Sequence, residues 1–325
     1  MTQYIIILLD DTSVSFCHYG NGKKERNLMS LETLKAAIIY AMKENLNIQF
    51  VYPSYELPSG YQEVIDSIDH TDIKPAGMGV EAEVVVFEGW KQVIGYSYKQ
   101  GVSYVVRTDR QSLYSHVDTL CALLNTVERL NVVLTDIEEF AEEDFHSYAN
   151  VLHALAIEVE KLYVAGKSVQ LNLLTDRMML DKMNNCGAGD TTITLAPDGK
   201  FYVCPAFYLT NEEDVIGKLN GSVGDLSQGL EIKNPQLYKL GHAPLCRGCD
   251  AYQCKRCIWL NRKTTYEVNT PSHEQCVVAH LERNASRDLL NAIRKHGRFL
   301  PEREDIKEIT YLDPFDVKED LKLIM

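Results

Sequence analysis

Cysteines are the residues with the clearest capacity for chemistry. Seven of the nine fall between residues 186 and 276, and they are Cys186, Cys204, Cys246, Cys249, Cys254, Cys257 and Cys276. A Cys-x2-Cys spacing lets two thiolates from one tight turn point at the same metal or cluster, while backbone amides donate to the sulfurs. Seven thiolates exceed one tetrahedral site. The simplest interpretation is two metal centres, each completed by a cysteine from a distant part of the segment.

The spacing within residues 246–257 argues against one class of zinc site. Four cysteines fall within these twelve positions, whereas the two pairs of a zinc ribbon are separated by about 15 residues or more. The residues alone leave the metal open, and structural zinc held by four thiolates is one of the alternatives. Disulfides are not indicated in a cytosolic protein, because that compartment keeps thiols reduced.

The two remaining cysteines stand apart from this group. Cys121 falls in an apolar helical stretch at residues 120–124, which indicates a core position. Cys17 follows the first apolar run and is either a small buried residue behind a strand or the remnant of a cluster motif. His18 beside it does not indicate a catalytic pair, because adjacent side chains at a strand end point apart. We find no convincing set of acid, base and nucleophile.

The elements that must position these residues divide the chain into two parts. Up to about residue 175, short β-rich runs alternate with amphipathic helical patterns. The expected strands are residues 4–9, 48–52, 83–87, 103–107, 131–134 and 169–174, and the expected helices are 31–44, 111–127 and 142–164. This alternation predicts a parallel α/β sheet or barrel. About six β/α units give a partial (β/α)6-type barrel, because a full barrel of this class needs eight.

The second part begins at about residue 181 and has a different pattern. Residues 191–195, a Pro-Asp-Gly turn at 197–199 and residues 200–203 predict a β-hairpin. Residues 278–296 return to helical spacing. We therefore expect an α/β domain over residues 1–180, a cysteine-rich α+β module over 181–296 and a tail over 297–325.

Three short segments around the hairpin carry a family resemblance. Residues 186–189 read CGAG, residues 195–199 read LAPDG, and residues 202–205 read YVCP. This series resembles the opening of a SPASM domain, the auxiliary-cluster module of many radical SAM enzymes that modify peptides. The family's cysteines are grouped as two, four and one, and this chain has the same order. It departs in the middle group, where the family has x5 and x3 and this chain has x4 and x2.

The resemblance implies two auxiliary 4Fe–4S clusters. The first takes Cys186, Cys204 and Cys257, and the second takes Cys246, Cys249, Cys254 and Cys276. The family often supplies a fourth cysteine for the first cluster shortly before the hairpin, but residues 122–185 contain none. Asp181 is a nearby oxygen donor, and an open iron site or a ligand from the substrate are the other expectations.

The first part resembles a radical SAM fold that has lost its cofactor chemistry. Radical SAM enzymes carry C-x3-C-x2-C after the first strand, where this chain has Asp10, Val14 and Cys17. Valine cannot ligate iron, and one thiolate cannot hold a cluster that needs three. At the turn that binds the methionine amine, only Glu56 fits the family pattern. The chain most resembles the cysteine-poor CXXX repeat peptide maturase group, and S-adenosylmethionine is not an expected cofactor.

Composition restricts the partners and the location. The net charge of −13 disfavours non-specific binding to nucleic acid and to anionic membranes. No apolar run approaches the ~20 residues of a membrane span, and the short run at residues 5–9 lacks the basic start of a signal peptide. We therefore expect a cytoplasmic protein with no nucleic-acid or membrane partner.

Two functions from different classes follow from the resemblance. In one, the chain assists the maturation of a ribosomally synthesised precursor peptide, one rich in cysteine, as a scaffold or electron relay beside a true radical SAM enzyme. In the other, it is an enzyme whose first cluster has an open iron that binds a substrate thiolate. The fallback is a zinc-stabilised module for peptide or protein interaction with no redox role.

Overall fold

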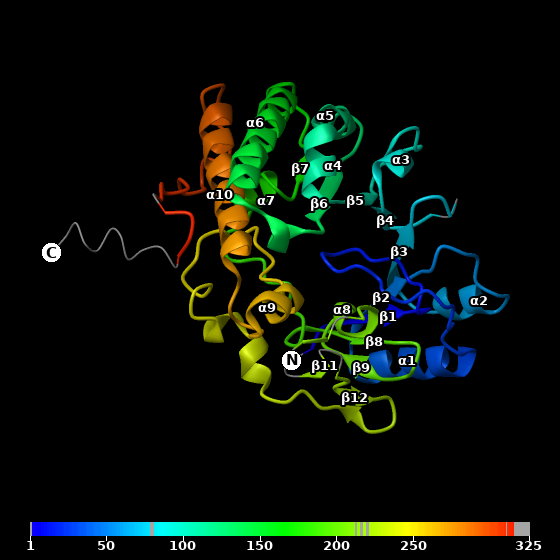
Figure 1. Cartoon of the computed structure of the whole chain (residues 1–325). Coiled ribbons are helices and arrows are strands. Elements are labelled where there is room, and N and C mark those ends of the chain that lie inside the picture. The colour runs from blue at the N-terminus through cyan, green and yellow to red at the C-terminus, as the bar shows by residue number, and fades with distance from the viewer. Residues whose placement is uncertain are drawn as a thin grey trace.

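A sheet of nine strands organises the computed structural model, which describes residues 2–78, 81–211, 213–214, 217–218, 221–309 and 311–314 (Figure 1). Its first seven strands are β1 (Tyr4–Leu8), β2 (Asn47–Val51), β3 (His70–Pro75), β4 (Val84–Phe87), β5 (Ser103–Thr108), β6 (Arg129–Leu134) and β7 (Gln170–Leu171). Each is parallel to the next in chain order. This sequential order is typical of β/α barrels and confirms the expected α/β class.

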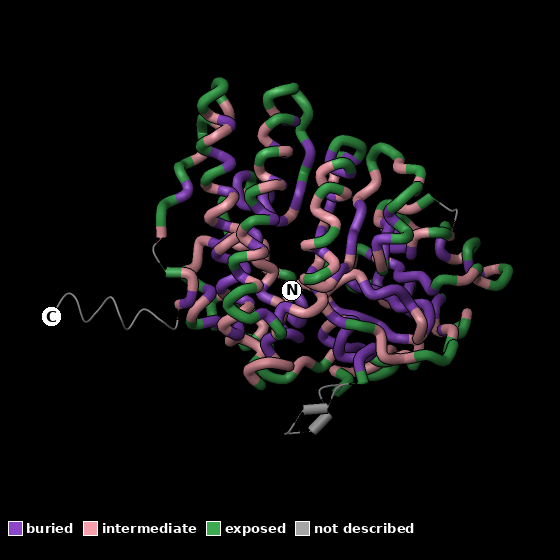
Figure 2. The backbone as a smooth tube through the Cα atoms, turned by 45° about the horizontal axis from the view of Figure 1, so that its top comes forward, coloured by how far each residue is buried: buried purple, intermediate pink, exposed green. Residues whose placement is uncertain are grey.

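The strands are buried on both faces because helices cover one side and the rest of the chain covers the other. In β1, Ile5 and Ile7 pack in the core cluster that contains helix α1 (Leu31–Lys43). Ile6 and Leu8 belong to the larger core on the opposite face, as the two-residue period of a strand requires. Buried backbone gathers in the interior of the molecule (Figure 2), and the continuous apolar run of β1 follows from burial on both sides.

The helices of this part are α1, α2 (Tyr61–Ile65), α3 (Trp90–Val93), α4 (Arg110–Ser115), α5 (Val117–Leu124), α6 (Glu142–Val164) and α7 (Thr175–Met179). The helix expected over residues 111–127 is in fact two helices. His116 leaves the helical conformation between them, with φ −123° and ψ 23°. Its ring stacks on the Trp90 ring at 4.5 Å, and its Nδ1 lies 2.7 Å from the Ser112 carbonyl.

The sequence analysis did not predict strand β3, because two of its buried side chains, Asp72 and Lys74, are charged. The Lys74 ammonium lies 2.6 Å from the Asp72 carboxylate, and both side chains are buried. Lys74 also donates to the Glu81 carbonyl at 3.0 Å and lies over the Tyr52 ring, 4.4 Å from its centroid. These contacts offset the free-energy cost of burying the Lys74 ammonium and the Asp72 carboxylate. The strand expected at residues 169–174 is confined to the two residues of β7.

The predicted hairpin is present as β8 (Thr192–Leu195) and β9 (Phe201–Tyr202), which pair in antiparallel orientation. Gly199 has φ +75° in the turn, a conformation that favours glycine. Strand β8 also pairs in parallel with β1, so the hairpin extends the sheet of the first part. The domain boundaries expected at residues 180 and 296 remain a prediction.

The rest of the chain is short elements followed by one long helix. They are α8 (Ala206–Leu209), β10 (Glu213–Asp214), β11 (Gly217–Lys218), β12 (Gly224–Asp225), β13 (Gly229–Leu230), α9 (Ile258–Thr265) and α10 (His273–Arg294), with 3-10 turns at Ile137–Glu139, Pro235–Tyr238 and Leu240–His242. Helix α10 lies beside α6 (Figure 1), and the Tyr148 hydroxyl of α6 donates to the Glu282 carboxylate of α10 at 2.7 Å. None of the described helices is long and apolar enough to cross a membrane.

Candidate metal centres

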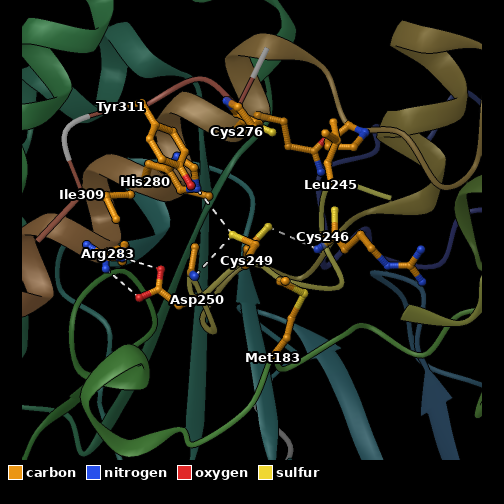
Figure 3. A pocket seen from close by; sticks show the side chains of 18 of the residues that line it. Met183, Leu245, Cys246, Cys249, Asp250, Cys276, His280, Arg283, Ile309 and Tyr311 are labelled. Atoms are coloured by element: carbon orange, nitrogen blue, oxygen red, sulfur yellow. Dashed lines mark hydrogen bonds and ion pairs between the residues drawn. The ribbon is translucent and has the colours of Figure 1, made fainter. Parts of the chain in front are cut away.

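One cavity is lined by four of the predicted ligands. Cys246, Cys249, Cys254 and Cys276 surround a space of about 390 Å³. The first three come from the irregular segment before α9, and Cys276 comes from the first turn of α10. Figure 3 shows Cys246, Cys249 and Cys276 approaching this space together with His280. The His280 Nε2 lies 3.4 Å from the Cys249 sulfur. The structure thus brings together the whole set assigned to the second cluster.

The irregular segment is held in place by a buried ion pair. Both Arg283 nitrogens that face Asp250 lie 2.6 Å from its carboxylate oxygens, and the Arg283 side chain is fully buried (Figure 3). Arg177 reaches the same carboxylate at 3.5 Å, and these cations hold the pKa of Asp250 below its usual value despite its burial. Fork-shaped guanidinium–carboxylate contacts fix geometry as well as charge. Asp250 directly follows Cys249, so this pair orients the cysteine segment.

A second cavity of about 450 Å³ contains the other three predicted ligands, Cys186, Cys204 and Cys257. It opens onto the inner face of the sheet, where Gln49 of β2 and Asn131 of β6 line it. Cys17 lines the same cavity. Sequence spacing did not indicate this, because Cys17 is 169 positions before Cys186.

Asp181 does not belong to this group. Its side chain is 77% exposed and lies 3.9 Å from Arg303, and it lines a different surface depression from the one with the cysteines. The position of Asp181 therefore gives no support to its role as a ligand of the first cluster.

Backbone amides point at three of the sulfurs. The Ala188, Ala251 and Arg256 amides donate to the sulfurs of the cysteines two residues earlier, at 3.5, 3.4 and 3.4 Å. Amide donation to thiolate sulfur is a feature of iron–sulfur sites and tunes their potential. In each case, the turn that follows the cysteine fixes the position of its sulfur. The amide would also partly offset the negative charge of a thiolate at that place.

Burial makes these thiols poor acids in the absence of a cation. It raises the pKa of Cys246 to about 11 and that of Cys254 to about 12. Burial also raises the pKa of Cys257 and Cys276 well above the ordinary value. A bound metal centre would supply the positive charge that ionised thiolates need. The donor set and its surroundings thus fit such a group.

One short segment serves both cavities. Cys254 faces the first cavity and Cys257 the second, although only two residues separate them. Arg256 between them adopts φ +46°, rare for a side chain other than glycine. Its guanidinium is buried and donates to Asn185 at 2.8 Å and to the Tyr238 carbonyl. These contacts stabilise the turn that sends the two cysteines to different cavities.

A smaller space of about 70 Å³ lies between the two cavities and is lined by Cys254, Cys257 and Glu282. Burial raises the pKa of Glu282 to about 7, although hydrogen bonds from Tyr148 and Gln253 oppose the shift. Between about pH 4.5 and 7, the folded carboxyl retains a proton that the unfolded chain has released. Stability should therefore fall with rising pH across this range, by up to about 3 kcal/mol.

We expect Glu282→Gln to remove this pH dependence and to be more stable than the wild type at about pH 8. The amide stays neutral, and its oxygen can still accept from Tyr148. Urea unfolding of anaerobic protein at about pH 5 and pH 8 would measure the effect, with Glu143→Gln, an exposed position on α6, as the control. The same pH slope in Glu282→Gln and the wild type would contradict this assignment.

The loop after β1 is stabilised by its own polar contacts. The Asp10 carboxylate is buried and accepts from the Tyr55 hydroxyl at 2.8 Å and from the Thr12 amide at 2.7 Å. Val14 is buried, and its amide donates to the Tyr52 carbonyl at 3.0 Å. Asp10 and Val14, which the family resemblance aligns with two cluster thiolates, thus have structural roles of their own, Asp10 through its carboxylate and Val14 through its backbone amide and its burial. Glu56 is exposed.

Comparison with known proteins shows similarity in structure. No protein-family model matches the chain, and no curated protein matches it. The structure of hexahistidine-tagged anSMEcpe with bound AdoMet matches with a TM-score of 0.61 at 13% identity, covering 90% of this chain and 96% of that one. Native anSMEcpe with bound AdoMet and the Cp18Cys peptide matches with a TM-score of 0.61 at 14% identity, covering 90% and 99%. At this identity the match shows a shared fold, and the chain has the fold of anSMEcpe, as the resemblance stated from the sequence predicted.

Proposed function

We propose that this chain is a cytoplasmic iron–sulfur protein that takes part in the maturation of a ribosomally synthesised peptide. In this proposal it holds two 4Fe–4S clusters and has no S-adenosylmethionine-cleaving cluster of its own. Bound clusters would supply one-electron transfer, so the chain would act as a scaffold or electron relay for a radical SAM partner enzyme.

The observation that carries the proposal is the sorting of the cysteines into two cavities. Each cavity contains every cysteine that the SPASM resemblance assigns to one cluster. Zinc thiolate bonds are about 2.3 Å long, so a mononuclear site needs its ligands close together. Within the described parts of the chain, no group of three or more His, Cys, Asp or Glu residues is already arranged to hold a metal ion of any kind, so this finding does not separate zinc from iron. Thiols spread around spaces of about 390 and 450 Å³ suit a larger inorganic group.

Support for a peptide substrate comes from the inner face of the sheet. The anSMEcpe structure that matches this chain was determined with the Cp18Cys peptide. Here the cavity with Cys186 is lined by the amide side chains of Gln49 and Asn131, while the Asn172 amide is already bound to the Val132 backbone. Such groups can both donate to and accept from a peptide backbone. A cysteine-rich precursor is the substrate that the family resemblance favours.

Metal analysis tests this proposal directly. Protein purified anaerobically without chelator should contain about eight iron atoms and eight sulfides per chain, as two four-iron clusters require. The measurement is iron, acid-labile sulfide and zinc per chain, together with the absorption band of the clusters. Stoichiometric zinc with no sulfide would favour the zinc-stabilised interaction module and exclude the redox role.

A further inference from the structure

We propose that Cys17 is the fourth thiolate of the centre that contains Cys186, Cys204 and Cys257. The inference rests on the proposed function in that it assumes a cluster at this place. It assigns a ligand from the first part of the chain to a site that otherwise belongs to the second part. The site then has four thiolates, the usual complement for a 4Fe–4S cluster.

The first support is position. All four cysteines line the same cavity. Cys121, the ninth cysteine, lies on α5 and lines neither cavity.

The second support is the way in which the Cys17 loop is fixed. Arg107 of β5 donates from Nε to the Cys17 carbonyl at 3.0 Å and from a terminal nitrogen to the Tyr19 carbonyl at 2.5 Å. The His18 Nδ1 lies 2.7 Å from the Leu134 carbonyl at the end of β6. A cluster ligand needs a backbone held by such outer contacts. The loop is therefore anchored to β5 and β6 at Cys17 and at the two residues that follow it.

The third support is contact with the segment that supplies another ligand. The Tyr19 ring meets the Trp259 ring edge-on at 6.4 Å, and Trp259 follows Cys257 by two residues. Tyr19 and Trp259 are both buried. The Cys17 loop and the Cys257 segment thus share one packed core, which holds the two sulfurs in a defined relation.

Asp181 and His18 are the two other candidates for the fourth ligand of this centre. Asp181 is exposed and lies outside the cavity. His18 lines the cavity, but its Nδ1 is engaged by Leu134, and cysteine is the usual ligand of a four-iron cluster. A site with four thiolates has no open iron, so the proposal favours a relay or scaffold over a cluster that binds a substrate thiolate.

The test compares Cys17→Ala and Cys17→Ser with Cys121→Ala and His18→Ala, all purified anaerobically. We expect Cys17→Ala to lose one of the two clusters or to convert it to a 3Fe–4S form with its own EPR signal. Cys17→Ser should keep the iron but change the Mössbauer parameters of one cluster, because an alkoxide replaces a thiolate. Cys121→Ala should match the wild type in iron, sulfide and spectra.

A double variant shows whether the ligands share one centre. If Cys17 and Cys186 hold the same cluster, Cys17→Ala/Cys186→Ala should lose no more iron than Cys186→Ala alone. Additive losses would show that Cys17 belongs to a separate centre and would overturn the proposal. Wild-type iron and spectra in both Cys17 variants, or cluster loss only in His18→Ala, would overturn it as well. Wild-type protein without iron would instead contradict the proposed function itself.

Discussion

Replacing Cys249 and Cys254 together with serine is expected to expose residues 231–272 to proteases while the sheet stays folded. Apart from α9, the described part of this segment has only two short 3-10 turns, at Pro235–Tyr238 and Leu240–His242. Before α9, the buried apolar residues of this segment are Ala243, Cys246 and Ala251, which are too few to offset the entropy of ordering. In the proposed cluster-loaded protein, metal–thiolate bonds would supply the difference, so loss of the metal would become loss of local structure.

The hairpin should respond differently from this segment. Strand β8 pairs with β1 along four residues, so residues 192–202 should remain as resistant in the double variant as in the wild type. Limited proteolysis followed by mass spectrometry would locate the first cuts, and Cys121→Ser provides the control. Equal protection of residues 231–272 in the double variant and the holo protein would show that the cysteines do not hold this segment.

Reductive cleavage of S-adenosylmethionine is expected to be absent. The sulfonium must approach an iron of a cluster held by three thiolates, and two of those positions are Asp10 and Val14. The Asp10 carboxylate is already bound to Tyr55 and Thr12, and Val14 is buried in the core. With dithionite as reductant, 5′-deoxyadenosine should stay at the level of a reaction without protein.

A matched variant gives this experiment a clear outcome. Cys17→Ala should give the same background as the wild type, because neither protein has the three thiolates. An authentic radical SAM enzyme in the same buffer confirms that the assay detects turnover. Turnover by the wild type that Cys17→Ala abolishes would show that the loop after β1 holds a cluster after all.

Local pattern was sufficient for much of the fold. The apolar run of β1 and the helical spacing of α1 and α6 come from burial within one element, and each lies where the periodicity placed it. Strand β3 could not be recognised, since its Asp72 and Lys74 are buried as a pair and conceal the apolar alternation. The break at His116 depends on the Trp90 ring, which is distant in sequence.

The candidate site likewise has one part that local spacing predicts and another part that depends on contacts between distant residues. Seven cysteines were found from spacing, because short turns bring neighbouring thiolates together without help from the rest of the chain. Cys17 lines one cavity with three of them, and Arg107 of β5, 90 positions away, anchors its loop over the sheet. Likewise, the buried pair of Arg283 and Asp250 aligns residues 33 positions apart. No local spacing predicts such long-range placements.

If both cavities hold clusters, as proposed, the turn at Arg256 has a consequence for the order in which they assemble. Holding a residue other than glycine at positive φ costs about 1–2 kcal/mol, and here the turn sets the positions of Cys254 and Cys257 at once. The first centre to assemble would fix this turn and thereby prepare the ligand of its neighbour. Assembly would then be positively cooperative, so limiting iron would give a mixture of fully loaded and unloaded chains with few intermediates.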